Sequence, residues 1–168
     1  MKITLVNPPI SLADVYGRFK KLASFQPPVG LTSLASYLLQ YKHEVSIIDC
    51  NALALTVEDV VKEVGKNPPD LLGMYTISYN YPVIELLAKG LKEKAPDLKI
   101  VAGGPHATFL PEQTLRETPI DFCVMGEGEE TLHELVQHLE DRAKDFSEIQ
   151  GLAFKTTEGE IKVNSERV

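Results

Sequence analysis

The sequence predicts an α/β domain built on a doubly wound, five-stranded parallel sheet. Short apolar runs rich in Val and Ile recur along the chain, segments of helical periodicity separate them, and Gly and Pro interrupt the connections. Because the runs are short and nearly unbroken, they are typical of strands buried on both faces. The predicted strands are Ile3–Val6, Val45–Ile48, Leu71–Tyr75, Ile100–Ala102 and Phe122–Met125.

The segments between these strands predict helices from the spacing of their apolar side chains. Helical spacing covers Val29–Tyr41, the stretch after Thr56, Tyr81–Ala95 and Glu129–Arg142. Thr56 followed by Asp59 three residues later predicts a capping box. The segment Pro111–Thr118 has room for a short helix of two turns before Pro119 ends it.

Strands that alternate with helices require right-handed crossovers, which produce an open sheet with helices on both faces. We expect the Rossmann-like, flavodoxin-like strand order 2-1-3-4-5. Beyond Gly151 the pattern changes, since Leu152–Lys155 and Glu160–Val163 flank a turn with Gly159 and predict a β-hairpin. The expected division is an α/β domain over residues 1–148 and a hairpin linker over residues 149–168, and we expect the chain to be part of a longer protein.

Composition limits the partners that we expect. The 168 residues carry a net charge of −7, and Lys and Arg are scattered, which argues against binding to nucleic acid or an anionic membrane. The longest basic run, Arg18–Lys21, is interrupted by Phe19 and is typical of a solvated loop. No stretch approaches the roughly 18 apolar residues of a membrane span. Two cysteines, Cys50 and Cys123, suit a reducing compartment, so we expect a cytoplasmic protein.

The candidate site is expected at the carboxyl ends of the strands, where ligands bind in sheets of this type. Four loops there carry small and polar residues: Asn7-Pro8-Pro9, Thr76 to Asn80, Gly103 to Thr108, and Gly126 to Thr131. Gly103 and Gly104 lack Cβ atoms and let the backbone approach a flat or bulky ligand, and Thr76 and Ser78 supply hydroxyls. Each loop alone also fits an ordinary turn, but together they favour a site.

Two kinds of phosphate chemistry are disfavoured. A dinucleotide fold needs Gly-x-Gly-x-x-Gly after its first strand, whereas Asn7-Pro8-Pro9 stands there. The turn Gly126-Glu127-Gly128 is followed by further glutamates, whose charge repels a pyrophosphate and suits a helix N-terminus instead. A phosphoacceptor domain needs acids where this chain has Asn7 and Thr76.

Metal and hydrolytic chemistry are also disfavoured. The four histidines are dispersed and no CxxC motif occurs, so we expect no metal ligands. A small hydrolase using Ser78, His106 and Glu127 is the least favoured hypothesis, because the spacing shows no pairing of base and nucleophile. For His106, a ligand contact and a plain turn position both stay open.

Five motifs in this order resemble the N-terminal cobalamin-binding domain of the cobalamin-dependent radical SAM enzymes. They are Asn7-Pro8-Pro9, Gln26-Pro27-Pro28-Val29-Gly30-Leu31, His43-Glu44-Val45, Gly103-Gly104-Pro105-His106-Ala107-Thr108, and Gly126-Glu127-Gly128-Glu129-Glu130-Thr131. Each motif is weak by itself, but five in order with strands between them are fairly specific. The resemblance covers essentially the whole chain, including the hairpin that begins at Ile149.

The resemblance implies that a corrinoid, cobalamin (vitamin B12), lies across the carboxyl ends of the strands with its nucleotide tail between sheet and helices. The residues that match the segments lining that site are Asn7, Pro8, Pro9, Pro28, Gly30, Thr76, Ser78, Gly103, Gly104, His106, Gly126, Glu127 and Gly128. Cobalamin-binding mutases carry Asp-x-His-x-x-Gly after strand one, where this chain has Asn7-Pro8-Pro9-Ile10-Ser11. We therefore expect no histidine ligand to cobalt.

The resemblance also implies a function for the module. Radical SAM chemistry needs Cys-x-x-x-Cys-x-x-Cys thiolates for a [4Fe-4S] cluster, which Cys50 and Cys123 do not form. The chain is then expected to position cobalamin for its own C-terminal radical SAM barrel, which would hold the cluster and S-adenosylmethionine and perform methyl transfer or ring formation. The alternative is a flavodoxin-like regulatory or interaction domain with a vestigial cofactor pocket.

Overall fold

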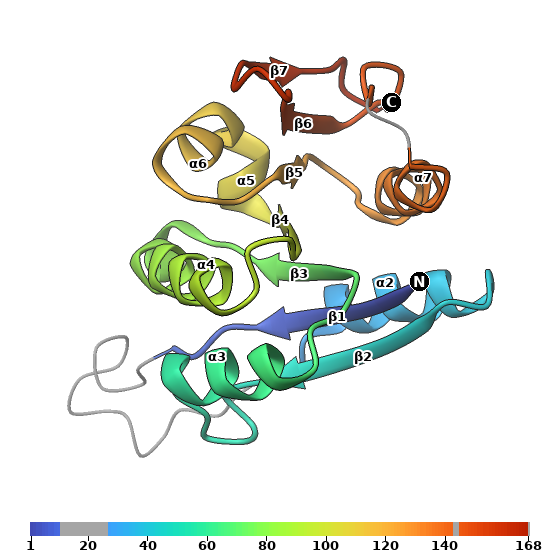
Figure 1. Ribbon diagram of the computed structural model, residues 1–168. Helices are drawn as coiled ribbons and strands as arrows, with labels where there is room; N and C mark the ends of the chain where they lie inside the picture. The colour runs from blue at the N-terminus through green and yellow to red at the C-terminus, as the bar shows by residue number, and fades with distance from the viewer. Residues whose placement is uncertain (11–26, 143–144, 168) are drawn as a thin grey trace.

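The structure is a computed structural model that describes residues 1–10, 27–142 and 145–167 (Figure 1). It contains a seven-stranded sheet in the order β2-β1-β3-β4-β5-β6-β7. The strands are β1 (Lys2–Asn7), β2 (Glu44–Asp49), β3 (Leu71–Tyr75), β4 (Lys99–Gly103), β5 (Phe122–Val124), β6 (Leu152–Lys155) and β7 (Ile161–Val163). The basic run Arg18–Lys21, and Ser11 and Gln26 of the two quoted motifs, lie outside the described residues.

Strands β1 to β5 are parallel, and their order 2-1-3-4-5 confirms the prediction. The predicted hairpin is also confirmed, with Gly159 at positive φ in its turn. It extends the sheet, because β6 pairs antiparallel with β5 and places Leu152, Ala153 and Phe154 in the core. The division at residue 148 stays a prediction.

Two layers of helices cover the sheet. They are α2 (Val29–Leu39), α3 (Val57–Lys66), α4 (Tyr81–Lys94), α5 (Pro105–Phe109), α6 (Pro111–Glu117) and α7 (Glu129–Glu140), with a 3-10 turn η2 (Ser78–Asn80) before α4. Helices α2 and α7 lie on one face of the sheet, and α3 to α6 lie on the other (Figure 1). Consecutive strand residues alternate between the faces: Leu5 packs with α2 and α7, and Val6 packs with α3 and α4.

Local signals decide where several helices begin. The predicted capping box is present: Thr56 Oγ1 accepts from Asp59 N at 3.2 Å, and Asp59 Oδ2 accepts from Thr56 N at 3.0 Å. The short helix predicted from Pro111 is also present. Helix α5 was not predicted, although Pro105 at its first position pre-sets a helical φ.

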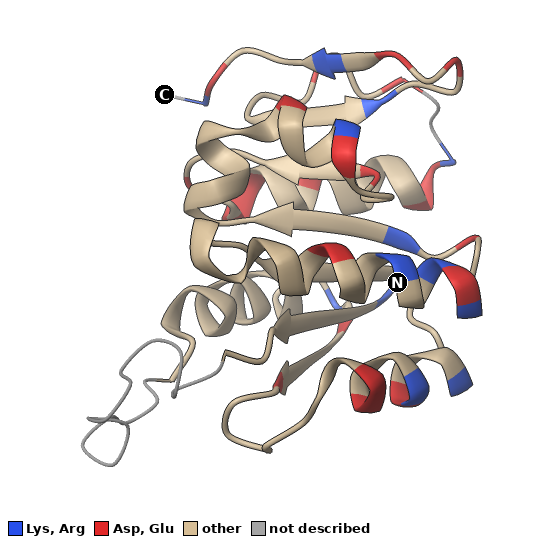
Figure 2. Cartoon of the chain, turned by 90° about the vertical axis from the view of Figure 1, so that its left-hand side faces the viewer, with Lys and Arg blue, Asp and Glu red and all other residues tan. Residues whose placement is uncertain are grey.

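Charge is unevenly distributed along the strands. Figure 2 shows that Lys and Arg of the described chain lie mainly toward the amino ends of the parallel strands, away from the arrowheads. Among the described residues, the carboxyl edge is therefore poor in positive charge. In the same described ranges, no helix has both the length and the apolar character needed to cross a membrane.

The junction between β4 and α5 separates the roles of two adjacent glycines. Gly104 has φ +100°, and a Cβ added to it would lie 2.8 Å from the carbonyl oxygen of Thr76. Within the part of the chain that the structure describes, a Cβ added to Gly103 would meet no atom within 4 Å. The sequence predicted that both glycines leave room for a ligand. The structure gives Gly103 the open space and requires Gly104 for its backbone conformation.

We predict that Gly104→Ala lowers the free energy of unfolding by about 1–3 kcal/mol, because it combines a positive φ with a backbone clash. Gly103→Ala is the matched control and is expected to leave that free energy nearly unchanged. Urea denaturation of both variants measures the difference. Equal stability of the two variants would contradict the assignment.

Candidate functional site

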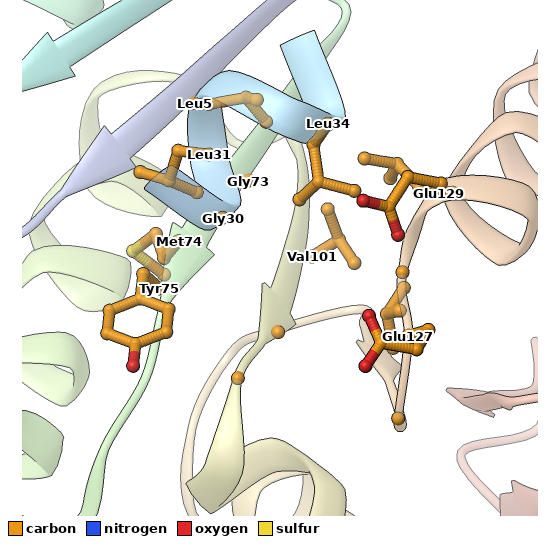
Figure 3. Close-up of a pocket in the computed structure, with 16 residues that line it drawn as sticks. Leu5, Gly30, Leu31, Leu34, Gly73, Met74, Tyr75, Val101, Glu127 and Glu129 are labelled. Carbon is orange, nitrogen blue, oxygen red and sulfur yellow. The ribbon is translucent and has the colours of Figure 1, made fainter. Parts of the chain in front are cut away.

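A cavity of about 160 Å³ lies between helices α2 and α7 and the carboxyl ends of the central strands (Figure 3). Its walls are mainly aliphatic side chains and glycines, together with Met74, Tyr75 and two glutamates. The lining residues are Leu5, Gly30, Leu31, Leu34, Gly73, Met74, Tyr75, Val101, Gly103, Gly104, Val124, Gly126, Glu127, Gly128, Glu129 and Leu132.

The cavity brings together part of the predicted site. Gly30, Gly103, Gly104, Gly126, Glu127 and Gly128 line it. The other predicted residues, which are Asn7, Pro8, Pro9, Pro28, Thr76, Ser78 and His106, do not line it. The aliphatic lining from Leu5, Leu34 and Val101 was missed, because apolar residues at core spacing give no signal that distinguishes a cavity wall from filled core.

Three glycines form an open cradle at the edge of this cavity. A Cβ added to Gly30, Gly103 or Gly126 would meet no atom of the described residues within 4 Å. These glycines come from α2, from the end of β4 and from the turn after Met125, so the open space is shared by segments far apart in sequence. The arrangement leaves room for a bulky ligand above the cavity and lets backbone groups approach it.

The Asn7-Pro8-Pro9 loop is held by the end of β2. Asn7 Nδ2 donates to Asp49 Oδ1 at 3.0 Å, and Asn51 Nδ2 donates to the carbonyl oxygen of Pro8 at 3.0 Å. Asn51 Oδ1 accepts from Ile10 N at 2.8 Å. Asp49 and Asn51 were not among the predicted site residues, although the parallel register places Asp49 directly beside Asn7. The side chain of Asn7 therefore anchors the loop.

Thr76 fastens β3 to the start of α5. Its side chain is fully buried, and its Oγ1 donates to the carbonyl oxygen of Gly103 at 2.9 Å and accepts from Ala107 N at 3.2 Å. The hydroxyl was expected to face a ligand, but it is engaged on both sides by the protein. Its effect on the cavity is to position Gly103.

His106 lies beneath the same edge and is only 6% exposed. Its Nδ1 is 3.1 Å from Ser78 Oγ, its ring lies 4.3 Å from the ring of Tyr81, and its Nε2 is buried with no hydrogen-bond partner in the described part of the chain. Burial lowers the pKa of His106, and the charge of Glu117 partly opposes this effect. The described contacts of the His106 ring are therefore with Ser78 and Tyr81.

The geometry does not support the hydrolase hypothesis. Ser78 and His106 are within hydrogen-bond distance, but no carboxylate within the described ranges contacts the other ring nitrogen of His106. A serine triad needs such a carboxylate to orient the imidazole. Glu127, the third residue of that hypothesis, lines the cavity, which His106 does not reach.

Fold and site together define an α/β ligand-binding domain whose site is built from backbone and apolar side chains at the carboxyl edge of a parallel sheet. Residues 18–136 match the family model described as the B12 binding domain. The chain belongs to this family.

The chain is also similar to larger proteins. It is 39% identical to an uncharacterized methyltransferase of Pyrococcus horikoshii, over 92% of this chain and 33% of that protein. It is 34% identical to an anaerobic magnesium-protoporphyrin IX monomethyl ester cyclase of Synechocystis, over 94% of this chain and 31% of that protein. The chain thus spans about a third of the length of the curated relatives that it matches.

Solved structures share the fold. The structure of the cobalamin-dependent S-adenosylmethionine radical enzyme OxsB, with aqua-cobalamin and S-adenosylmethionine bound, has a TM-score of 0.82 at 21% identity, over 99% of this chain and 22% of that chain. The methyltransferase TsrM from Kitasatospora setae, with cobalamin and a [4Fe-4S] cluster bound, has a TM-score of 0.78 at 20% identity, over 100% of this chain and 30% of that chain. These likenesses confirm the predicted fold.

The buried histidines predict a pH-dependent stability. Burial lowers the pKa of both His43 and His106 below the ordinary value of 6.5. As the pH falls below about 6.5, the unfolded chain takes up protons that the folded chain resists, so the free energy of unfolding decreases.

We expect His106→Gln to flatten the dependence of unfolding free energy on pH between about pH 7 and pH 5. Adding His43→Gln should flatten it further, because the two sites do not share partners. Urea denaturation across this pH range measures the slope. If His106→Gln leaves the slope unchanged, burial of His106 does not lower the free energy of unfolding at acidic pH.

Proposed function

We propose that this chain binds cobalamin at the glycine cradle and, in a longer protein, positions it for a radical SAM catalytic domain. The observation that carries the proposal is the open cradle of Gly30, Gly103 and Gly126 above an apolar cavity, at the carboxyl edge of a B12-binding domain. A corrin is a broad face rimmed by amides, which needs clearance and backbone partners more than it needs charge.

The cavity is too small to enclose the whole cofactor, so only one part of cobalamin lies inside it in this proposal. Pockets that enclose a whole drug-sized ligand measure about 300–1,000 Å³. A cavity of about 160 Å³ takes only one arm of a molecule as large as cobalamin. The aromatic base of the nucleotide tail is the flat, apolar arm that suits it. The corrin then lies outside, over the cradle and beside Asn7-Pro8-Pro9 and Pro28.

When bound, a corrinoid supplies cobalt-centred group-transfer chemistry, and the residues of this chain hold and orient it. Two relatives are a methyltransferase and a cyclase, which supports assigning the longer protein to one of these two reaction types. In this proposal a separate C-terminal barrel holds the [4Fe-4S] cluster and S-adenosylmethionine, and the segment 149–168 leads toward it. Free, buried Cys50 and Cys123 suit a reducing compartment, the cytoplasm.

Hydroxocobalamin added to the 168-residue chain is expected to bind with a perturbed corrin absorption spectrum. Gly103→Leu should raise the dissociation constant at least about tenfold, or about 1.4 kcal/mol, because the new side chain fills the cradle. Its melting temperature should stay nearly unchanged, since a Cβ at Gly103 meets no atom within 4 Å. Equilibrium dialysis measures the binding.

Ser36→Leu on the exposed side of α2 is the control and should bind as the unsubstituted chain does. No retention at ligand concentrations up to about millimolar, a binding free energy weaker than about −4 kcal/mol, would instead favour a regulatory domain with a vestigial pocket.

A second expectation concerns cobalt. His106 is buried, and its Nδ1 lies beside Ser78, so it is not positioned to reach a ligand above the sheet edge. The cobalt(II) form bound to the chain should therefore show high-field electron paramagnetic resonance lines without nitrogen splitting, in both the unsubstituted chain and His106→Ala. Triplets that vanish in His106→Ala would identify His106 as a ligand. Triplets that persist would indicate the cofactor's own base and contradict its place in the cavity.

A further inference from the structure

The interior of the cavity offers almost no polar side chain to a ligand. Leu5, Val101 and Leu132 are at most 3% exposed and belong to the core cluster on this face. Among the lining residues, the charged side chains are Glu127 and Glu129, and neither Lys, Arg nor His is present. Figure 3 shows these glutamates on the α7 side, with Leu5, Leu31 and Met74 across from them.

The two glutamates accept hydrogen bonds and do not donate them. Glu129 Oε1 already accepts from Ser33 Oγ at 2.6 Å, which ties α7 to α2 at the rim of the cavity. Glu127 is exposed and solvated. Tyr75 also lines the cavity, but it is 37% exposed, and Figure 3 shows its hydroxyl pointing away from Leu34 and Val101. A ligand group that carries lone pairs and lies among the aliphatic side chains therefore finds no side-chain donor beside it and faces two carboxylates at the rim.

Cobamides differ in the aromatic base of the nucleotide tail. A cavity wall of aliphatic side chains can therefore discriminate between cobamides by the polarity of that base. A dimethylbenzimidazole that is detached from cobalt has one unbonded ring nitrogen, and its methyl groups and aromatic edge suit aliphatic neighbours. Adenine has more unbonded ring nitrogens and an exocyclic amine, and most of these groups would lose their hydrogen bonds to water without a side-chain partner among the aliphatic residues. Burial of an unpaired polar group is costly, so a wall of this kind rejects the purine more strongly than it favours the benzimidazole.

We propose that the aliphatic cavity makes this chain selective for cobamides with a benzimidazole base over cobamides with a purine base. This inference rests on the proposed function, because it assumes that the chain binds a cobamide with the base in the cavity. The residues that determine the selectivity are Leu5, Leu34, Val101 and Leu132.

Three ligands test the proposal on the unsubstituted chain by equilibrium dialysis: hydroxocobalamin, its adenine-containing counterpart, and cobinamide, which lacks the nucleotide. We expect the adenine cobamide to bind at least tenfold more weakly than hydroxocobalamin, about 1.4 kcal/mol. Cobinamide should also bind more weakly, because it leaves the cavity empty.

Each other outcome has one meaning. If none of the three ligands binds, the proposed function fails. If cobinamide binds as tightly as hydroxocobalamin, the chain still binds a corrinoid, but the base lies outside the cavity and the selectivity proposal is overturned. If the adenine cobamide binds as tightly as hydroxocobalamin, the cavity does not select the base.

Leu34→Gln tests the cavity wall directly. Leu34 is half-buried on α2, lines the cavity, and lies opposite Gly128. An amide there both donates and accepts, so we expect the preference for benzimidazole over adenine to fall at least threefold. Leu39→Gln, on the same helix at a side chain that is 54% exposed, should leave the preference unchanged. If Leu34→Gln lowers the melting temperature too far for binding assays, the comparison of the three ligands still decides the proposal.

Discussion

The placement of β1 between β2 and β3 is the constraint on which the site depends. The right-handed crossover from β1 to β2 carries α2 on one face of the sheet, and the crossover from β2 back to β3 carries α3 on the other. Four helices then cover the α3 side, whereas α2 and α7 cover the other face of the described structure. The cavity forms where these two helices meet the carboxyl ends of β3 and β4, so the topology itself produces the opening.

Polar side chains and glycines at this edge have separate roles. Asp49, Asn51 and Thr76 use their hydrogen bonds to fix loops and strand ends. Gly103 and its counterparts in the cradle supply space. A neutral, amide-rimmed ligand needs little more than this, because backbone groups brought close by glycine replace charged side chains as partners. Few Lys and Arg of the described residues lie at the carboxyl edge, which is consistent with binding through backbone groups (Figure 2).

The sequence predicted the features that local patterns encode. Strand runs, the Thr56 capping box, the hairpin with Gly159 and the parallel order all follow from periodicity, turn chemistry and crossover handedness. The antiparallel pairing of β6 with β5 was not predicted. The sequence pattern of a strand shows where the strand lies but not which other strand it pairs with. The distinction between Gly103 and Gly104 was equally inaccessible, since it depends on a backbone angle and on Thr76, which is distant in sequence. His106 likewise shows its burial only in three dimensions.

Hydrogen bonds from two sides fix the rim of the cavity, and this bears on the affinity that the cavity could have for a ligand. Ser33 of α2 contacts Glu129 in the first turn of α7. On the outer side, Arg167 donates to Thr131 Oγ1 at 3.0 Å and to Glu134 Oε2 at 2.6 Å, and Thr131 Oγ1 donates to the carbonyl oxygen of Gln150 at 2.9 Å. A turn fixed in this way loses little further freedom when a ligand arrives, so more of the apolar contact inside the cavity contributes to binding. The segment after β7 thus stabilises the start of α7, which borders the cavity.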